Sequence, residues 1–340
     1  MDYVIGVDGG TTKTIALVAD GRGHILGAAR GGGSNWLGNE GLETPMGVVV
    51  ATVQEALRQA GVLASEVAMA AMALAGADWP EDHTARQAFL AQAGIARQVV
   101  VKNDTFAGLR AGTSEPFGVV VAAGTGCNAA AIAPDGREWA FGYYEDDGGS
   151  GTIAWAAYKA VLRAEDGRGK PTRLTEVVLG RLGFPTPEAL LRAHLAGQID
   201  HGRFLSLCPL VFALADMGDE VAVEIIVREG LILAEYATAL IRRFDMQALE
   251  FDVVCNGSVW KGQGPLLIDT FIQAVHRVAP RARIVRARFE PAIGGVLLAY
   301  DALHRPVSDE MYANLARTAP GPEFFSTFDG GHPPRRLRRE

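Results

Sequence analysis

The sequence has little cysteine and no long uninterrupted hydrophobic run. Its three cysteines, Cys127, Cys208 and Cys255, are too few and too widely spaced for a disulfide framework or a CxxC metal site. The seven histidines form no HExxH pattern, so the sequence predicts no structural metal. Polar and charged residues interrupt even the apolar stretch 48–63, which predicts that no helix spans a membrane.

The charge balance is acidic. The net charge of −7 argues against nucleic acid as a partner, and the arginines near the C-terminus, within 335–339, are typical of a solvated tail. The first residues enter a strand pattern at once, which predicts no secretory leader and a cytoplasmic protein. The 340 residues, of which 49% are hydrophobic, are enough for two domains.

Both halves of the chain begin with strands that are joined by tight turns. Segments 3–7, 14–19 and 24–29 are β-prone, and helices then alternate with strands, a pattern typical of a mixed α/β layer. Segments 118–123 and 129–133 repeat the opening about one third of the way along the chain. This repetition predicts two related domains with a cleft between them.

The first turn combines an aspartate with small and hydroxylated residues. Its sequence, residues 8–14, is DGGTTKT, which is not a Walker loop, because G-x4-GK[ST] is absent and a strand follows it. Gly9, Gly10, Thr11 and Thr12 can present backbone N–H groups and hydroxyls to phosphate, and Lys13 adds charge. The alternative is an ordinary hairpin turn.

One further residue of this turn and a second turn suit phosphate chemistry. Asp8 needs a cation if it lies beside phosphate, so we expect it to hold Mg²⁺ through water. Gly124, Thr125 and Gly126 form a second glycine- and threonine-rich turn in the matching position of the other half. Two such turns predict binding of one polyphosphate from both sides.

Asn103 and Asp104 lie where a short strand meets a helix. A carboxylate at this point can accept the proton of a substrate hydroxyl as that hydroxyl attacks phosphorus. Aspartate is also a favoured helix N-cap, which is the structural alternative for Asp104.

Four segments in this order resemble the N-acetylglucosamine kinase family. They are DGGTTKT, KNDTFAGLRAG at 102–112, FGVVVAAGTGCN at 117–128 and CNGSVW at 255–260. The family belongs to the superfamily of acetate and sugar kinases, actin and chaperone ATPases, and the resemblance extends to about residue 303. It implies an α/β fold of two ribonuclease-H-like (actin-like ATPase) domains with an interdomain cleft. It also implies transfer of the γ-phosphoryl group of MgATP to a hydroxyl of an amino sugar, N-acetylglucosamine or glucosamine.

The resemblance assigns roles to individual residues. It makes Asp104 the general base and a sugar ligand, places Asn35 on the sugar, and makes 9–13 and 124–126 the phosphate loops. Gly257 and Ser258 match the loop that borders adenosine, although Asn256 and Gly257 could also form a plain turn. Asn35 could equally be a loop residue with a local hydrogen bond, and the pair Gly294–Gly295 could serve close helix packing.

One segment departs from the family pattern. Kinases of this family usually carry GGWG followed by GDEGSG, whereas residues 140–151 read AFGYYEDDGGSG. Asp147 matches the motif aspartate and is expected on the sugar. Gly148 replaces the motif glutamate and Phe141 replaces the tryptophan, which puts the identity of the sugar in doubt.

The predicted domains are an N-terminal lobe, 1–113, onto which helices in 292–318 pack, a C-terminal lobe, 114–290, and a tail, 319–340. The family suggests a homodimer. Two alternative functions remain open. One is an ATPase that activates an acyl-CoA dehydratase or reductase and carries an iron–sulfur cluster, for which the cysteines form no close pattern. The other is a sugar sensor without catalytic turnover.

Overall fold

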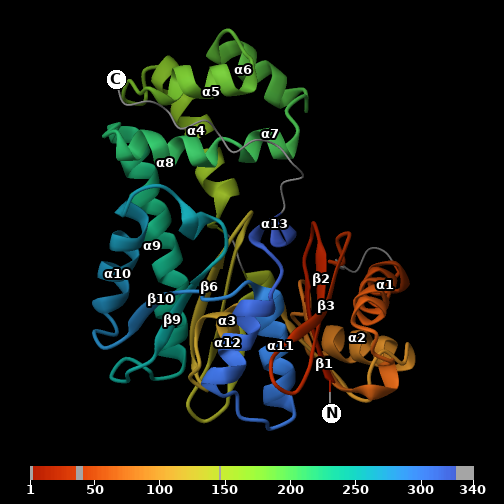
Figure 1. Cartoon of the computed structure of the whole chain (residues 1–340). Helices are drawn as coiled ribbons and strands as arrows, with labels where there is room; N and C mark the ends of the chain where they lie inside the picture. Colours follow the sequence, from red (N-terminus) through yellow and green to blue (C-terminus); the bar gives the residue numbers. More distant parts are fainter. Residues whose placement is uncertain (1–2, 36–40, 145–146, 327–340) are drawn as a thin grey trace. The chain divides into compact units, whose positions relative to one another are not determined.

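The computed structural model describes residues 3–35, 41–144 and 147–326, and the basic segment 335–339 lies outside them. The described chain is a mixed α/β protein with two five-stranded sheets, which confirms the predicted fold class (Figure 1). It divides into two compact units. Among the described residues, the first unit comprises 3–35, 41–120, 130–144 and 285–326, and the second comprises 121–129 and 147–284.

The first sheet has the strand order β3-β2-β1-β4-β5. Strands β1, β2 and β3 form an antiparallel meander, whereas β4 pairs in parallel with both β1 and β5. The strands are β1 (Tyr3–Gly9), β2 (Thr14–Ala19), β3 (Ile25–Gly31), β4 (Val67–Leu74) and β5 (Val99–Asn103). Because parallel strands end at the same edge of a sheet, the carboxyl ends of β1, β4 and β5 lie together.

The second sheet repeats this plan. Its order is β10-β9-β6-β7-β8, which read from the other end is β8-β7-β6-β9-β10 and matches the first sheet strand for strand. The strands are β6 (Gly118–Ala123), β7 (Cys127–Ile132), β8 (Glu138–Ala140), β9 (Asp252–Asn256) and β10 (Arg283–Arg286). The repetition seen in the sequence is therefore a repetition of topology.

Helices cover both faces of the first sheet (Figure 1). On one face Ile5 and Val7 belong to a buried core with Met46 and Val49 of α1. On the other face α11 crosses β1, where a Cβ added at Gly6 would lie 2.1 Å from a backbone atom of α11. The helices of this unit are α1 (Glu43–Ala60), α2 (Pro80–Gln92), α3 (Asp104–Gly112), α11 (Pro291–Ala302), α12 (Asp309–Thr318) and α13 (Pro322–Phe325).

The glycine pair of α11 brings three elements close together. A Cβ at Gly294 would lie 1.9 Å from the carbonyl oxygen of Ala107 in α3. A Cβ at Gly295 would lie 3.1 Å from the backbone nitrogen of Val7 in β1. The close-packing role considered for this pair is therefore correct, and it holds α3 and β1 against the same helix.

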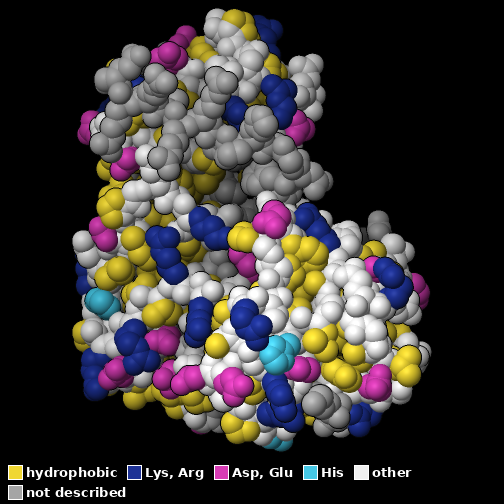
Figure 2. Space-filling model, in the orientation of Figure 1, with side chains coloured by type: hydrophobic (Ala, Val, Ile, Leu, Met, Phe, Trp, Pro, Cys, Tyr) yellow, Lys and Arg dark blue, Asp and Glu magenta, His cyan; other side chains and the backbone are white. Residues whose placement is uncertain are grey.

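The second unit is mainly helical beyond its strands. The long helix α9 packs against α10, α8 and α4. The helices are α4 (Ser150–Glu165), α5 (Leu174–Leu182), α6 (Pro187–Leu195), α7 (His201–Leu205), α8 (Cys208–Asp216), α9 (Glu220–Arg243) and α10 (Leu266–His276). Within the part of the chain that the structure describes, no helix is both long enough and apolar enough to cross a membrane. The face shown in Figure 2 carries both basic and acidic side chains.

Candidate active site

The carboxyl edge of the first sheet brings together residues that are far apart in the sequence. Gly9 of β1 pairs with Leu74 of β4, and Leu74 pairs with Asn103 of β5. Asp8, the last but one residue of β1, therefore lies close to the point where β5 ends and Asp104 begins α3. Crevices at the carboxyl ends of parallel strands are the usual ligand sites of α/β folds.

The first turn leaves two backbone donors available. Gly10 donates its N–H to the carbonyl of Lys13 at 2.9 Å, and Ser34 donates to the carbonyl of Gly10 at 3.0 Å. The amides of Thr11 and Thr12, which are exposed, have no hydrogen-bond acceptor among the residues that the structure describes. Adjacent free amides on one bend are a suitable cradle for an anion.

Two side chains hold this turn in place. The ammonium of Lys13 donates to the carbonyl of Phe325, so its charge is tethered beside the turn. Asn35 donates from Nδ2 to the hydroxyl of Thr11 at 3.2 Å, while its buried Oδ1 has no partner in the described chain. The structure thus joins the predicted sugar residue to the predicted phosphate loop.

Asn103, and not Asp104, caps helix α3. Its Oδ1 accepts the N–H of Thr105 at 2.9 Å, which is the usual N-cap bond. Asp104 is the first helical residue, and Thr105 also donates its hydroxyl to Asp104 at 3.4 Å. The capping role that could have explained an aspartate here belongs to its neighbour.

Asp78, which sequence reasoning missed, joins the same cluster. Its Oδ1 accepts a hydrogen bond from Nδ2 of Asn103 at 2.6 Å, so it fixes the amide that caps α3. A Cβ at Gly142 would lie 2.7 Å from this carboxyl group, so the chain passes close by. The available signal was an aspartate that follows β4 at the same sheet edge as Asp8.

The clustered carboxyl groups have raised pKa values. The pKa of Asp104 is raised to about 7, mainly by burial and also by the charges of Asp8 and Asp78, against the hydrogen bonds from Thr105. Burial also raises the pKa of Asp8 to about 6, opposed by Lys13 and assisted by Glu290. A carboxyl group with a pKa near neutrality is suited to proton transfer.

The second turn, in the other unit, is also closed by a glycine N–H, but it is one residue shorter than the first. Gly124 donates its N–H to the carbonyl of Gly126 at 2.9 Å, and the exposed amides of Thr125 and Gly126 have no acceptor in the described ranges. The carbonyls of Gly124 and Thr125 accept from Ser150 and Gly151, at 2.8 and 3.0 Å. The first turn of α4 therefore fixes this bend with its amides directed away from α4.

Gly257 lies against the strand that leads into the second turn. Its φ is +103°, and an added Cβ would lie 2.4 Å from the carbonyl oxygen of Ala123. Glycine is required here both by the backbone conformation and by the close approach. Ser258, which follows, is exposed. The predicted adenosine loop thus borders the predicted phosphate loop.

Asp147 and its neighbours form the segment that departs from the family pattern. Thr152 donates its hydroxyl to Asp147 at 3.0 Å, and Tyr236 donates to the Asp147 carbonyl at 2.9 Å. Gly148 has a φ of +110°, and an added Cβ would lie 2.8 Å from Cβ of Cys127. The backbone therefore has no room for a glutamate at position 148.

A second carboxylate reaches this segment from α9. Glu229 accepts the N–H of Gly149 at 2.7 Å. Sequence reasoning missed this residue. The feature that could have indicated it is a glutamate on the apolar face of a long helix.

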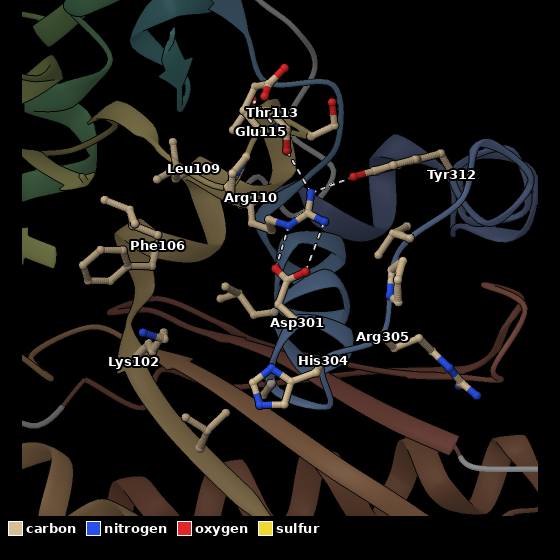
Figure 3. A pocket seen from close by; sticks show the side chains of 18 residues that line it. Lys102, Phe106, Leu109, Arg110, Thr113, Glu115, Asp301, His304, Arg305 and Tyr312 are labelled. Atoms are coloured by element: carbon tan, nitrogen blue, oxygen red, sulfur yellow. Dashed lines mark hydrogen bonds and ion pairs between the residues drawn. The ribbon is translucent and has the colours of Figure 1, made fainter. Parts of the chain in front are cut away.

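A cavity of about 580 Å³ lies elsewhere in the first unit, between α3, α11 and the segment before α12 (Figure 3). Its walls carry an ion pair between Arg110 and Asp301 at 2.7 Å, and Arg110 also donates to the hydroxyl of Tyr312. Lys102 and Phe106 line it, but Asn103 and Asp104 do not. The cavity is therefore separate from the candidate active site.

Comparison with known proteins identifies relatives along most of the chain. An N-acetyl-D-glucosamine kinase of Dictyostelium discoideum is 27% identical over 315 residues, which cover 88% of this chain and 98% of the relative. An N-acetylmuramic acid/N-acetylglucosamine kinase of Clostridium acetobutylicum is 26% identical over 303 residues, with the same coverage of 88% and 98%.

A solved structure is also similar. It is a candidate N-acetylglucosamine kinase of Chromobacterium violaceum with a TM-score of 0.66 and 26% identity, covering 88% of this chain and 99% of that one. Residues 5–299 match the profile of the BadF/BadG/BcrA/BcrD ATPase family. The chain belongs to this family of BadF/BadG/BcrA/BcrD ATPases.

Proposed function

We propose that this chain is an ATP-dependent sugar kinase, a phosphotransferase with an alcohol group as acceptor. The observation that carries the proposal is the carboxyl edge of the first sheet. There Asp104, whose pKa is raised to about 7, shares an edge with a turn whose Thr11 and Thr12 amides have no partner in the described chain. A base next to an anion-binding turn is the combination that phosphoryl transfer to a hydroxyl requires.

The relatives support this activity and the class of substrate. Two of them are kinases of N-acetylglucosamine or of N-acetylmuramic acid, and they match almost over their whole lengths. We therefore propose an amino sugar, N-acetylglucosamine or glucosamine, as the acceptor.

The chain's own residues fit MgATP. The free amides of Thr11 and Thr12 would bind phosphate oxygens in the first unit, and those of Thr125 and Gly126 would do so in the second. Gly257 and Ser258 would border the adenosine. Asp8 is half-buried with a raised pKa, so a nearby cation would stabilise its charged form. Mg²⁺ held there through water would supply neutralisation of phosphate charge.

Asp104 would act as the general base. Its carboxylate would accept the proton of the acceptor hydroxyl as that oxygen forms a bond to the γ-phosphorus and the bond to the bridging oxygen of ADP breaks. Asn103, held by Asp78, fixes the start of α3 and so the direction of the Asp104 carboxyl group. Asn35 and Asp147 would bind the sugar.

A sugar panel tests the proposal. We expect ADP release, measured by a coupled assay, with at least one of N-acetylglucosamine, glucosamine, N-acetylmuramic acid and N-acetylmannosamine, and little release with glucose. Binding of these sugars without ADP release would indicate a sensor instead. ATP hydrolysis unaffected by any sugar would contradict the kinase proposal.

The iron–sulfur alternative gains no support from the cysteine positions. Cys127, Cys208 and Cys255 are all buried, with at most 6% of their surface exposed, and they lie on three different elements. A cytoplasmic location and a homodimer remain proposals, for which fractionation and sedimentation are the measurements.

A further inference from the structure

Helix α9 buries a charged residue on its apolar face. Glu229 is 1% exposed and lies on the same stripe as Ile226 and Leu233, both of which are completely buried. A buried carboxyl group costs free energy unless hydrogen bonds offset its lost hydration. A glutamate at this position therefore needs a reason beyond packing.

Only one of the two carboxyl oxygens of Glu229 has a hydrogen-bond partner among the described residues. Oε1 accepts the N–H of Gly149 at 2.7 Å, whereas Oε2 is buried without a partner among the described residues. Burial raises the pKa of Glu229 to about 7, opposed by the Gly149 bond and assisted by the charge of Asp147. Burial raises the pKa of the Cys208 thiol in α8, and the charge of Glu229 also raises it.

Gly149 connects this carboxyl group to the second phosphate turn. It caps α4 with a φ of +90°, and an added Cβ would lie 2.5 Å from the carbonyl oxygen of Gly126. The next two amides, of Ser150 and Gly151, bind the carbonyls of Gly124 and Thr125. Residues 149, 150 and 151 thus each lie against one residue of the turn 124–126.

We propose that Glu229 is a positioning residue for the turn 124–126, through its bond to Gly149. By fixing Gly149 it keeps the first turn of α4 in register with the carbonyls of the bend. That register keeps the amides of Thr125 and Gly126 directed outward and available to an anion. The inference rests on the proposed function, in which these amides bind the phosphates of ATP.

Two substitutions separate the effect of the length of this side chain from the effect of its charge. Glu229→Gln keeps an oxygen that can accept the Gly149 N–H, whereas Glu229→Asp keeps the carboxyl group but is one methylene too short. We expect Glu229→Asp to weaken ATP binding about tenfold, the value of one lost hydrogen bond, and Glu229→Gln to change it less than about threefold. The KM for the sugar should stay within about twofold in both variants.

The measurements are ATP affinity by calorimetry, KM values by ADP release, and amide hydrogen exchange without nucleotide. Exchange at 149–151 should become faster in Glu229→Asp but not in Glu229→Gln. Thr238→Ala is the matched control, because Thr238 is a buried polar residue of the same helix. Its hydroxyl donates to the carbonyl of Glu235, also in α9, and has no other partner among the described residues. This substitution should leave ATP affinity unchanged.

ATP affinity in Glu229→Asp equal to that of the wild type would overturn the inference, as would equal losses in both variants and in Thr238→Ala. These outcomes differ from a failure of the proposed function. In that case the wild type would release no ADP with any sugar. The comparison of ATP affinity and exchange rates between the wild type and the Glu229 variants would still test the role of Glu229.

Discussion

At the scale of single residues, Asp104 stands apart because Asn103, and not Asp104, caps α3. We expect Asp104→Asn to lower kcat by about 10²–10⁴-fold, which is the usual contribution of a general base. ATP affinity should be largely kept, because the substitution leaves the amides proposed to bind phosphate untouched. Steady-state kinetics with calorimetry would check this, and near wild-type turnover would show that another group is the base.

The raised pKa of Asp104 gives the reaction a pH dependence. The base acts only when it is ionised, so kcat/KM should fall as pH falls through about 7. Asp78 is one of the two charges that raise this pKa, and Asp78→Asn removes its charge while an amide oxygen remains to face Asn103. The acid limb of the pH–rate profile should therefore move to lower pH in this variant. An unmoved or higher limb would assign the titration to another group.

The sequence allowed Asp104 to be predicted because a strand, an Asn-Asp pair and a helix follow one another locally. Asp78 and Glu229 could not be found in this way. Asp78 gains its importance from strand pairing, which places the end of β4 beside the end of β5. Glu229 contacts a glycine 80 positions earlier in the chain. Both roles depend on tertiary contacts that a local pattern does not contain.

At the scale of elements, α11 determines how closely α3 and β1 approach. Gly294→Ala would place a Cβ 1.9 Å from the Ala107 carbonyl oxygen, so the helices must move apart. We expect a loss of about 1–3 kcal/mol in the free energy of unfolding, as for other overpacked cores, and a lower kcat because α3 carries Asp104. Urea unfolding and steady-state kinetics measure the two effects.

Gly47→Ala is the matched control for this substitution. Gly47 is also within a helix, α1, but it is exposed and a Cβ there would meet nothing within 4 Å. Alanine should therefore stabilise the protein by about 0.5–1 kcal/mol through its higher helix propensity. Equal effects of the two substitutions would show that Gly294 is not under packing constraint.

Element positions were more predictable than their exact ends. The strand expected at 3–7 runs to Gly9, and the strand expected at 24–29 is β3, which runs from Ile25 to Gly31. Helix α1 begins at Glu43, after Leu42, without a side-chain cap that would mark its start in the sequence. Periodicity specifies the buried face of an element, whereas its ends depend on pairing partners and caps that the pattern does not contain.

At the scale of the whole molecule, the chain repeats one arrangement of strands and one kind of turn. Each unit has a turn in which a glycine, Gly10 or Gly124, donates its N–H to a carbonyl further along the turn, and the next two amides, of 11–12 or 125–126, have no partner in the described chain. The sequence predicted this duplication because the glycine and threonine spacing is local. How the carbonyls are fixed in the second turn was not predictable, because it depends on the start of α4.

The last prediction concerns both turns together. Gly10 and Gly124 have room for a side chain among the described residues. There an added Cβ would meet only the Lys13 carbonyl, at 3.6 Å, in the first case and nothing within 4 Å in the second. Gly9 is less suitable, because its Cβ would lie 2.6 Å from both Leu74 and Ser34. Valine at either of the roomier positions should therefore leave the fold intact and occupy the space proposed for phosphate. We expect about a tenfold or greater loss of ATP affinity in each variant.

Gly180→Val is the control for both variants. Gly180 lies on helix α5, is exposed and has nothing within 4 Å of an added Cβ, so its substitution should leave ATP affinity unchanged. Calorimetric titration of the three proteins with ATP makes the comparison. A loss confined to Gly10→Val would assign nucleotide binding to the first unit alone, and unchanged affinity in both turn variants would remove the phosphate role of the repeated turns. A loss in both is the result expected if one nucleotide needs both bends, because neither pair of amides alone would then balance the charge of a triphosphate.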